Sequence, residues 1–413
     1  MLGKLLSDLV HDGRLTVIWP DGHSSTYGRG GTEAAVRLHG RLTPLSIRMW
    51  PELVFGEAYM DGRVTVERGT IADVLEILIS NYNRRRQGAI SRLIRLSRLM
   101  ARPVAQLNRV ARARKNVAHH YDLSDELYDL FLDADRQYSC AYFAHPRITL
   151  EEAQAAKKRH IASKLRLDRA GLKVLDIGCG WGGLALDLAR AHDANVLGVT
   201  LSTEQLSTAN NRAYAAGLSH RCQFDLRDYR QVEGKFDRIV SVGMFEHVGL
   251  SYYDAFFGRI RDLLSDDGVA LLHTIGRADG PSATNPWIAK YIFPGGYTPA
   301  LSEVMRSVER SGLFVTDIEV LRLHYAETLK EWRYRFRKNW ARAAAIYDEC
   351  FCRMWEFYLA SSEMTFRYGN QVVYQIQLAK RVDVLPMTRD YMSDSERAVL
   401  ARGRQSGRRS EAA

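Results

Sequence analysis

The stretch VLDIGCGWGG, at residues 174–183, decides the fold of this protein. Its first residues are apolar apart from Asp176, which predicts a buried strand. Gly178 and Gly180 follow, and they predict a tight turn into a helix that opens near Gly182. Glycine lets the backbone approach a ligand closely, as it does at the nucleotide sites of doubly wound folds. The stretch therefore predicts a strand, a turn and a helix that together form a cofactor site.

The residues around this turn alternate between strand-like and helix-like patterns. Strands are predicted at 173–177, 195–200, 222–226, 236–242 and 269–275. Helices are predicted between them at 182–192, 203–216 and 251–264. The later part of the chain predicts a helix at 301–311, a strand at 314–323, helices within 326–366 and a last strand at 372–379. Alternation of this kind favours an α/β fold with a doubly wound, Rossmann-like sheet.

The second predicted strand indicates which cofactor the turn binds. It ends in GVTLS, at 198–202, without the acidic residue that holds a ribose in dinucleotide sites, so dinucleotide binding is disfavoured. The turn, with Asp176, Gly178 and Gly180, instead resembles the first motif of class I S-adenosylmethionine-dependent methyltransferases. The resemblance implies that it binds the amino-acid end of S-adenosylmethionine.

Residues at the ends of the next two strands are further candidates for this cofactor site. Thr200 and Gln205 lie where the ribose next to the sulfonium is expected, and Asp228 and Tyr229 lie where an adenine is expected. Each of them is equally a candidate for a helix cap or a turn residue.

The chain is predicted to divide into four parts. Residues 1–83 contain short strands, Asp-Gly turns and a helix at 70–80, and they predict a small N-terminal α+β domain. Residues 84–115 form a basic amphipathic linker: eleven Lys and Arg and no acid lie between 81 and 115, out of a net charge of +10 for the whole chain. Such a segment favours an anionic surface as its partner. Residues 116–396 form the catalytic domain, and 397–413 are expected to be a disordered basic tail.

Composition excludes several classes of protein. A hydrophobic content of 46% and a charged content of 26% are ordinary for a globular protein, which excludes overall disorder and a collagen-like repeat. Five cysteines do not form a disulfide framework in a chain this long, and Cys350 and Cys352 are too close in sequence for a zinc knuckle. No metal site is predicted, and a cytoplasmic location is the simplest interpretation. No apolar run is long enough to span a membrane.

Several longer segments together resemble one family. They are HYDLSDELYDLFLD (120–133), QYSCAYF (137–143), SVGMFEHVG (241–249), LHTIG (272–276) and NPWIAKYIFPGGYTP (285–299). These segments are similar to the cyclopropane-fatty-acyl-phospholipid synthase family, and the resemblance runs from about 45 to about 385. It includes FGEAYMDGRVTVERGTIADVLEIL (55–78), a part that the shorter mycolic-acid cyclopropane synthases lack.

The resemblance implies an activity and a set of site residues. The activity is transfer of the methyl carbon of S-adenosylmethionine to the cis double bond of an unsaturated acyl chain in a membrane phospholipid. A bound bicarbonate ion then accepts a proton as a cyclopropane ring closes. The residues that would hold the bicarbonate are Cys140, Glu246, His273, Ile275 and Tyr325. Further cofactor contacts would come from Tyr121, Tyr138 and Ser139.

The residue types suit this chemistry. An isolated alkene is a weak nucleophile and reacts only with a strongly activated methyl group in a site that excludes water. Bicarbonate needs hydrogen-bond donors, and a carboxylate to fix its OH group. Aromatic rings such as Tyr291, Phe293 and Tyr297 would stabilise a cationic centre without attacking it. Each anion-site residue also has an ordinary structural interpretation: Cys140 as a small buried apolar residue, for example, or His273 as a core histidine.

The expected partner is a phospholipid bilayer with unsaturated chains and an anionic surface. The protein would attach to the inner face of the membrane from the cytoplasm, without binding nucleic acid. The resemblance also implies a homodimer formed partly through residues 1–83.

Three alternatives stay open. One is a related lipid methyltransferase whose product carries a methyl branch or a hydroxyl group. Another is a nucleic-acid methyltransferase, although NPWI (285–288) follows the fifth predicted strand rather than the fourth. The last is a non-catalytic lipid-binding protein.

Overall fold

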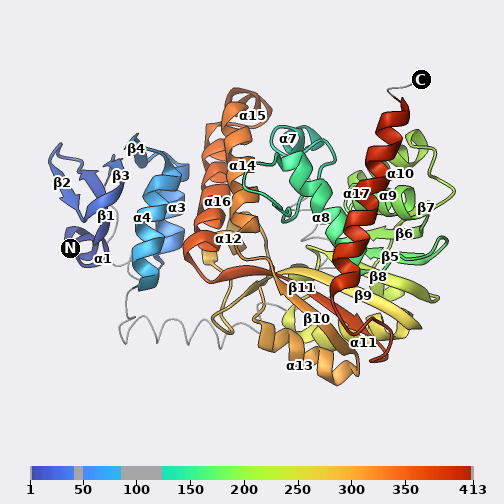
Figure 1. Ribbon diagram of the computed structural model, residues 1–413. Coiled ribbons are helices and arrows are strands. Elements are labelled where there is room, and N and C mark those ends of the chain that lie inside the picture. The colour runs from blue at the N-terminus through green and yellow to red at the C-terminus, as the bar shows by residue number, and fades with distance from the viewer. Residues whose placement is uncertain (1, 41–49, 85–122, 411–413) are drawn as a thin grey trace.

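The computed structural model describes residues 2–40, 50–84 and 123–410 (Figure 1). Two predictions lie outside the described residues: the basic linker from 85 to 115, and Tyr121. Within the described ranges, no helix is long and apolar enough to cross a membrane.

The N-terminal residues form a small α+β unit, as predicted. Its four-stranded sheet has the order β2-β1-β3-β4, with β1 antiparallel to β2 but parallel to β3. Alternate residues of β1, such as Leu15 and Val17, are buried, since successive side chains of a strand point to opposite faces. The elements are α1 (Leu2–Leu9), β1 (Asp12–Ile18), β2 (Ser24–Tyr27), β3 (Arg29–Leu38), α3 (Pro51–Met60), β4 (Val64–Arg68) and α4 (Ile71–Arg84).

A seven-stranded sheet forms the centre of the remaining chain. Its strands, in the order of the sheet, are β10 (Phe314–Val320), β11 (Gln371–Ala379), β9 (Leu264–Arg277), β8 (Phe236–Val242), β5 (Lys173–Ile177), β6 (Asn195–Thr200) and β7 (Cys222–Leu226). The strands from β9 to β7 pair in parallel, whereas β11 pairs antiparallel with both β9 and β10. The chain passes from β5 to β6 on one side and returns to β8 on the other, so the strand order reverses at β5. The predicted doubly wound fold is confirmed, and its switch point is where such sheets bind ligands.

Helices cover both faces of this sheet. One face packs against α11 (Tyr253–Leu263) and α13 (Leu301–Ser311), with Leu175 and Ile177 of β5 in the same buried cluster. The other face packs against α8 (Leu150–Lys164), α9 (Gly183–His192) and α10 (Thr203–Ala215), with Val174 in that cluster. Adjacent residues of one strand thus belong to different cores, as the pleat requires.

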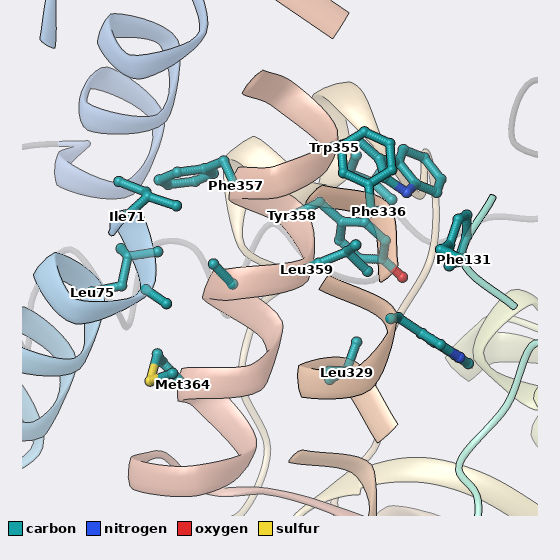
Figure 2. Close-up of a cluster of buried hydrophobic side chains, with 14 of the residues drawn as sticks. Ile71, Leu75, Phe131, Leu329, Phe336, Trp355, Phe357, Tyr358, Leu359 and Met364 are labelled. Carbon is teal, nitrogen blue, oxygen red and sulfur yellow. The ribbon is translucent and has the colours of Figure 1, made fainter. Parts of the chain in front are cut away.

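A further helical layer joins the N-terminal unit to the sheet. It consists of α14 (His324–Lys338), α15 (Trp340–Ile346) and α16 (Glu349–Tyr368), and α16 packs against α3 and α4 (Figure 1). Figure 2 shows Ile71 and Leu75 of α4 facing α16 beside Phe357 and Met364. The Tyr59 hydroxyl also donates a hydrogen bond to Glu356 at 2.6 Å. One hydrophobic cluster therefore runs from the N-terminal unit into the helical layer.

The C-terminal segment begins as a helix. Helix α17 (Asp390–Ser410) runs into the segment expected to be a disordered basic tail from 397, and that expectation stays a prediction. The first turns of α17 dock on α8, where Met392 is buried and Glu396 bonds to His160.

His160 of α8 lies between two carboxylates. Its Nε2 is 2.6 Å from Oε2 of Glu319 on β10, and its Nδ1 is 2.6 Å from Oε1 of Glu396 on α17. Burial lowers the pKa of His160, but the hydrogen bonds to Glu319 and Glu396 outweigh burial and leave this pKa above its usual value. The charged imidazole therefore stabilises the folded state fully below the unfolded pKa of about 6.5, and this contribution is lost as pH rises through the folded pKa.

We predict that His160→Gln destabilises the protein more at about pH 6 than at about pH 9, by about 1 to 3 kcal/mol, the usual value of hydrogen bonds to charged groups. Urea unfolding at the two pH values measures the difference. The exposed His220, changed to Gln, is the control and should show no such pH dependence. An equal loss at both pH values would mean that His160 is neutral in the folded protein.

Candidate active site

A pocket lies at the carboxyl ends of β5, β6 and β8, at the switch point of the sheet. Its walls come from the glycine turn after β5, the end of β6, residues 227–230, residues 242–244 and 247–248, and the loop at 136–139. All of the predicted cofactor residues that the structure describes line it: Tyr138, Ser139, Asp176, Gly178, Gly180, Thr200, Gln205, Asp228 and Tyr229. Residues scattered over about ninety positions of sequence thus meet in one cavity, and their role in binding a cofactor stays a prediction.

The glycine turn leaves room for a ligand. Gly178 and Gly180 both have positive φ, at 82° and 55°. A Cβ on Gly178 would come within 2.8 Å of Cβ of Met244, whereas a Cβ on Gly180 would meet no atom within 4 Å. The amide nitrogens of Gly178 and Cys179 donate to the carbonyl of Val199, which ties the turn to the end of β6. The backbone at Gly180 is thus open to a bound molecule.

Asp176 is a buried carboxyl group at the end of β5. It is 1% exposed, and its Oδ2 has no hydrogen-bond partner among the described residues. Burial raises the pKa of Asp176 to about 7, against the lowering effect of Lys157. An unpartnered carboxylate oxygen in a pocket wall suits a cationic ligand group, such as an ammonium.

The outer wall residues combine pocket lining with local structure. Thr200 Oγ1 donates a hydrogen bond to Oε1 of Gln205 at 3.0 Å, and Ser202 caps α10. Asp228 accepts two hydrogen bonds from the Arg230 guanidinium, at 2.8 and 2.6 Å. Both interpretations of these residues from sequence therefore hold at once: they fix turns and they face the cavity.

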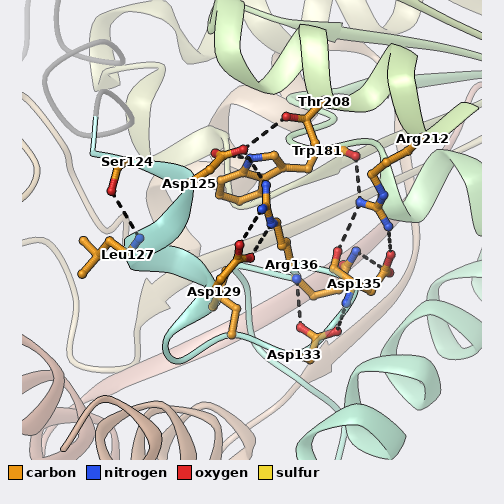
Figure 3. A network of polar contacts seen from close by, with 12 residues as sticks. Ser124, Asp125, Leu127, Asp129, Asp133, Asp135, Arg136, Trp181, Thr208 and Arg212 are labelled. Carbon is orange, nitrogen blue, oxygen red and sulfur yellow. Dashed lines mark hydrogen bonds and ion pairs between the residues drawn. The ribbon is translucent and has the colours of Figure 1, made fainter. Parts of the chain in front are cut away.

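An ionic network holds the loop at 133–139 against the glycine turn (Figure 3). Arg136 bonds to Asp125 and Asp129 of α7 (Asp125–Asp129), and Trp181 Nε1 donates to Asp125 at 3.0 Å. Asp135 is paired with Lys158 and with Arg212, which also donates to the Trp181 carbonyl. Because Trp181 follows Gly180 directly, this network sets the distance between the two walls of the pocket.

Glu246 lies behind the pocket wall, between the lining residues Met244 and His247. Its Oε1 accepts a hydrogen bond from the backbone N–H of Ile275 at 2.6 Å. Its Oε2 is buried and has no hydrogen-bond partner in the described part of the chain. Burial raises the pKa of Glu246 to about 7. The predicted residues Glu246 and Ile275 are therefore in direct contact.

The other predicted anion-site residues are His273, Cys140 and Tyr325. His273 precedes Ile275 by two positions on β9, so both point to the same face, and burial lowers the pKa of His273. Its Nδ1 is 3.1 Å from Nε2 of Gln375 on β11. Cys140 is buried, and burial raises the pKa of its thiol, so it is not a thiolate.

Cys140 and Tyr325 are linked through their neighbours. The N–H of Ala141, next to Cys140, donates to Thr328 Oγ1 at 3.0 Å, one turn along α14 from the buried Tyr325. None of the anion-site residues is among those that line the cofactor pocket; Cys140 follows the lining residue Ser139 directly. Their binding of bicarbonate stays a prediction.

Aromatic rings connect the two groups of residues. Tyr138 stacks on Trp332 with ring centres 5.2 Å apart, and Trp332 meets Tyr325 edge to face at 5.8 Å. The Tyr138 hydroxyl is 2.9 Å from that of Tyr358, whose ring contacts Phe293. Of the three aromatic residues proposed from sequence, Phe293 belongs to this group. Tyr291 and Tyr297 instead donate to Glu57 and Glu303.

Sequence reasoning missed Lys157, Trp332 and Tyr358. Lys157 lines the pocket and is buried on α8. A signal was present, because Lys157 shares the spacing of Leu150, Ala153 and Ile161, which places it on the buried face of a helix. No local signal marks Trp332 or Tyr358, since both lie in a helical layer about two hundred residues from Tyr138.

The comparison with known proteins covers most of the chain. The model of the family described as "Mycolic acid cyclopropane synthetase" matches residues 108–376, and that of a domain of unknown function matches residues 1–87. A probable fatty acid methyltransferase of Pseudomonas putida is 43% identical over 67% of this chain and 73% of its own length. The cyclopropane-fatty-acyl-phospholipid synthase of Escherichia coli K12 is 41% identical over 64% of this chain and 67% of its own length.

A solved structure agrees with these relatives. The mycolic acid cyclopropane synthase CmaA1, complexed with SAH and CTAB, is 36% identical with a TM-score of 0.61, and the match covers 64% of this chain and 97% of the other. The pocket described above lies within the part that the family model matches. This chain therefore belongs to the mycolic acid cyclopropane synthetase family, and its catalytic part has the fold of a class I S-adenosylmethionine-dependent methyltransferase.

Proposed function

We propose that this protein transfers the methyl carbon of S-adenosylmethionine to the cis double bond of an unsaturated acyl chain in a membrane phospholipid. A bound bicarbonate ion takes up the proton that leaves as the cyclopropane ring closes. The observation that carries the proposal is the arrangement of Glu246, with Oε1 held by the Ile275 amide and Oε2 buried without a partner in the described residues. A buried carboxylate oxygen of this kind requires a donor, and the OH group of bicarbonate is one.

The pocket at the switch point fits S-adenosylmethionine. Asp176 has a carboxylate oxygen to accept from the ammonium of the amino-acid end, and the open backbone at Gly180 admits that end. Thr200 with Gln205 and Asp228 with Tyr229 lie further along the same wall, where a ribose and an adenine would extend. When bound, S-adenosylmethionine supplies a methyl group activated by its sulfonium.

The protein's own residues then exclude water and stabilise positive charge. Tyr138 forms part of the cofactor pocket and, through Trp332, reaches the anion site at Tyr325. Aromatic faces attract a cationic centre on the alkene without forming a bond to it. An ionised protein carboxylate at the reacting carbon would be alkylated. The hydrogen bond from the Ile275 amide keeps the Glu246 carboxylate away from that carbon.

The anion site fits bicarbonate through both acceptors and donors. Glu246 accepts the hydrogen bond of the OH group. His273 stays neutral because burial lowers its pKa, so it retains one ring N–H as a donor without adding a full charge. The Tyr325 hydroxyl is a further donor from α14.

The lipid partner must be met at a bilayer surface, and we assign this contact to the basic segment 84–115. The stretch WRYRFRKNW (332–340) is less suited to this contact, because its arginines form ion pairs with carboxylates of the protein itself. Arg333 pairs with Glu363, Arg335 with Glu151 and Arg337 with Glu356. Attachment to the inner face of the membrane and a homodimer formed partly through residues 1–83 belong to the same proposal.

A second candidate is a related lipid methyltransferase that leaves a methyl branch instead of a ring. The relative named a probable fatty acid methyltransferase favours keeping it. The two candidates differ in which proton leaves after methyl transfer. Loss of a proton from the transferred methyl group closes the ring, whereas loss from a neighbouring chain carbon leaves a methyl-branched alkene. Purified protein with S-adenosylmethionine and vesicles of monounsaturated phospholipid separates them: a product heavier by one methylene that resists hydrogenation is the ring, and one that takes up hydrogen is not.

We predict that Glu246→Gln lowers turnover in this assay by about a hundredfold or more, the usual size of a lost proton-transfer partner, while the affinity for S-adenosylhomocysteine stays unchanged. The glutamine side chain cannot accept a hydrogen bond from bicarbonate without its NH2 group also presenting a donor to the site. Glu363→Gln is the matched control, since Glu363 is also buried but pairs with Arg333 and Arg367 away from the pocket. Full turnover in Glu246→Gln would remove this residue from the site.

The pH dependence of turnover should reflect the carboxyl groups. Burial raises the pKa of Glu246 and that of Asp176 to about 7 each, so both are ionised above about pH 7 and progressively protonated below it. We predict that activity falls as pH decreases through this range. Titrating S-adenosylhomocysteine binding at each pH separates Asp176, which acts on the cofactor, from Glu246, which acts on the lipid step. A flat profile from about pH 5 to 8 would contradict both assignments.

Membrane attachment gives another prediction. Reversing Arg92, Arg95 and Arg98 to Glu should weaken binding to anionic vesicles by at least about a hundredfold, because each basic residue contributes about 1 kcal/mol near such a surface. Vesicle sedimentation measures the effect. The same triple reversal at Arg402, Arg404 and Arg408 changes the net charge equally and should have a smaller effect. Equal losses in the two variants would show that net charge, not the linker, drives attachment.

A further inference from the structure

Lys157 is a buried lysine with an unusual environment. It lies on α8, is 1% exposed, and lines the cofactor pocket. Its Nζ donates to Oε1 of Gln137 at 2.5 Å and to Oγ of Ser139 at 2.9 Å. Both partners are neutral oxygens, and both belong to residues that line the same pocket.

The charge of Lys157 has no partner at ion-pair distance within the described ranges of the chain. Lys164, on the same helix and equally buried, differs in this respect, because its Nζ pairs with Glu319 and lies 3.9 Å from Asp317. Burying an ammonium without a counter-ion costs several kcal/mol. Burial accordingly lowers the pKa of Lys157 to about 8. The hydrogen bonds of Lys157 to neutral groups do not offset the free-energy cost of burying its charge.

Titratable groups from several elements interact electrostatically with this ammonium. Asp133, Asp135 and Cys140 come from the loop, Lys158 from its own helix, Asp176 from β5 and His273 from β9. Lys157 is the charge that lowers the pKa of Asp176, and it is the largest charge effect on both Cys140 and His273. The charge of Lys157 therefore acts on the carboxylate of the cofactor pocket and on two of the predicted anion-site residues, and its bonded partner Ser139 directly precedes Cys140.

We propose that Lys157 is a positioning residue whose ammonium holds Gln137 and Ser139 in the pocket wall and supplies the positive charge that an anion beside His273 and Cys140 requires. This inference rests on the proposed function, and it adds the counter-charge that the proposed bicarbonate ligands lack. Cys140 and His273 are neutral and Glu246 carries negative charge when ionised, so without Lys157 the set would repel an anion. With Lys157 present, a bound anion and the ammonium stabilise each other, and their attraction offsets the free-energy cost of burying the ammonium.

The test measures anion binding without turnover. Wild type, Lys157→Met and Lys164→Met are saturated with S-adenosylhomocysteine, and their thermal unfolding is followed as bicarbonate is added, against sodium chloride of equal ionic strength. A ligand that binds the folded state raises the midpoint in proportion to its occupancy. Wild type and Lys164→Met should respond over the same concentration range, whereas Lys157→Met should need at least about tenfold more bicarbonate, equivalent to about 1.4 kcal/mol.

Two further variants separate charge from packing. Lys157→Arg keeps the charge and should restore the bicarbonate response to within about threefold of wild type. Lys157→Gln keeps hydrogen-bonding capacity without charge, should behave as Lys157→Met, and replaces it if the methionine variant does not fold. In the lipid assay, the bicarbonate concentration that gives half-maximal turnover should be similar for wild type and Lys157→Arg, and higher for Lys157→Gln and Lys157→Met.

Two results would overturn the inference. One is a bicarbonate response of Lys157→Met equal to that of Lys164→Met. The other is a wild type that does not respond to bicarbonate at all, because no anion would then need the charge. The first result would remove only the role of Lys157, whereas the second would also remove bicarbonate from the proposed function. The methyl transfer is tested separately, by whether wild type forms the ring from unsaturated phospholipid.

Discussion

The hydrogen bond from the Ile275 amide to Glu246 is the interaction on which the active site depends. Glu246 follows β8 and Ile275 lies in β9, and the parallel pairing of these strands sets His273 opposite Val242. The Gly243 amide also donates to the His273 carbonyl, which fixes where the chain leaves β8. One carboxylate oxygen is thereby satisfied by the sheet itself, and the other is left for a ligand. Strand register thus places the carboxylate that we propose binds bicarbonate.

The charges around this bond are balanced close to neutrality. Burial raises the pKa of Asp176 and that of Glu246 to about 7 and lowers the pKa of Lys157 to about 8. Each group is costly to bury in its charged form, and each charge is stabilised when a ligand of opposite sign or suitable polarity enters. The proposed occupants, a methyl donor with an ammonium group and a bicarbonate ion, would supply these ligands, and water would compete with both.

Helix α16 connects the rest of the molecule to this site, because its neighbouring residues face different partners. Phe357 packs against Trp287 and against Phe55 and Tyr59 of the N-terminal unit. Tyr358, the next residue, bonds to Tyr138 in the pocket wall and contacts Phe293. Figure 2 shows the two side chains leaving the helix in different directions. The N-terminal unit and the aromatic wall of the site are thus supported by a single helix.

The sequence by itself determined the doubly wound sheet and the pocket-lining residues of the glycine turn and the strand ends, because strand periodicity, the glycine turn and the carboxyl ends of parallel strands are local features with a fixed geometry. Family-like motifs also placed Glu246 and Ile275 in one predicted site. Only the tertiary structure decided that Lys157 lines the pocket and bonds to Gln137 and Ser139, that Trp332 and Tyr358 join the aromatic wall, and that α17 docks through Glu396 on His160. These contacts join residues far apart in the chain, and whether a charge is solvated or buried depends on everything that packs around it.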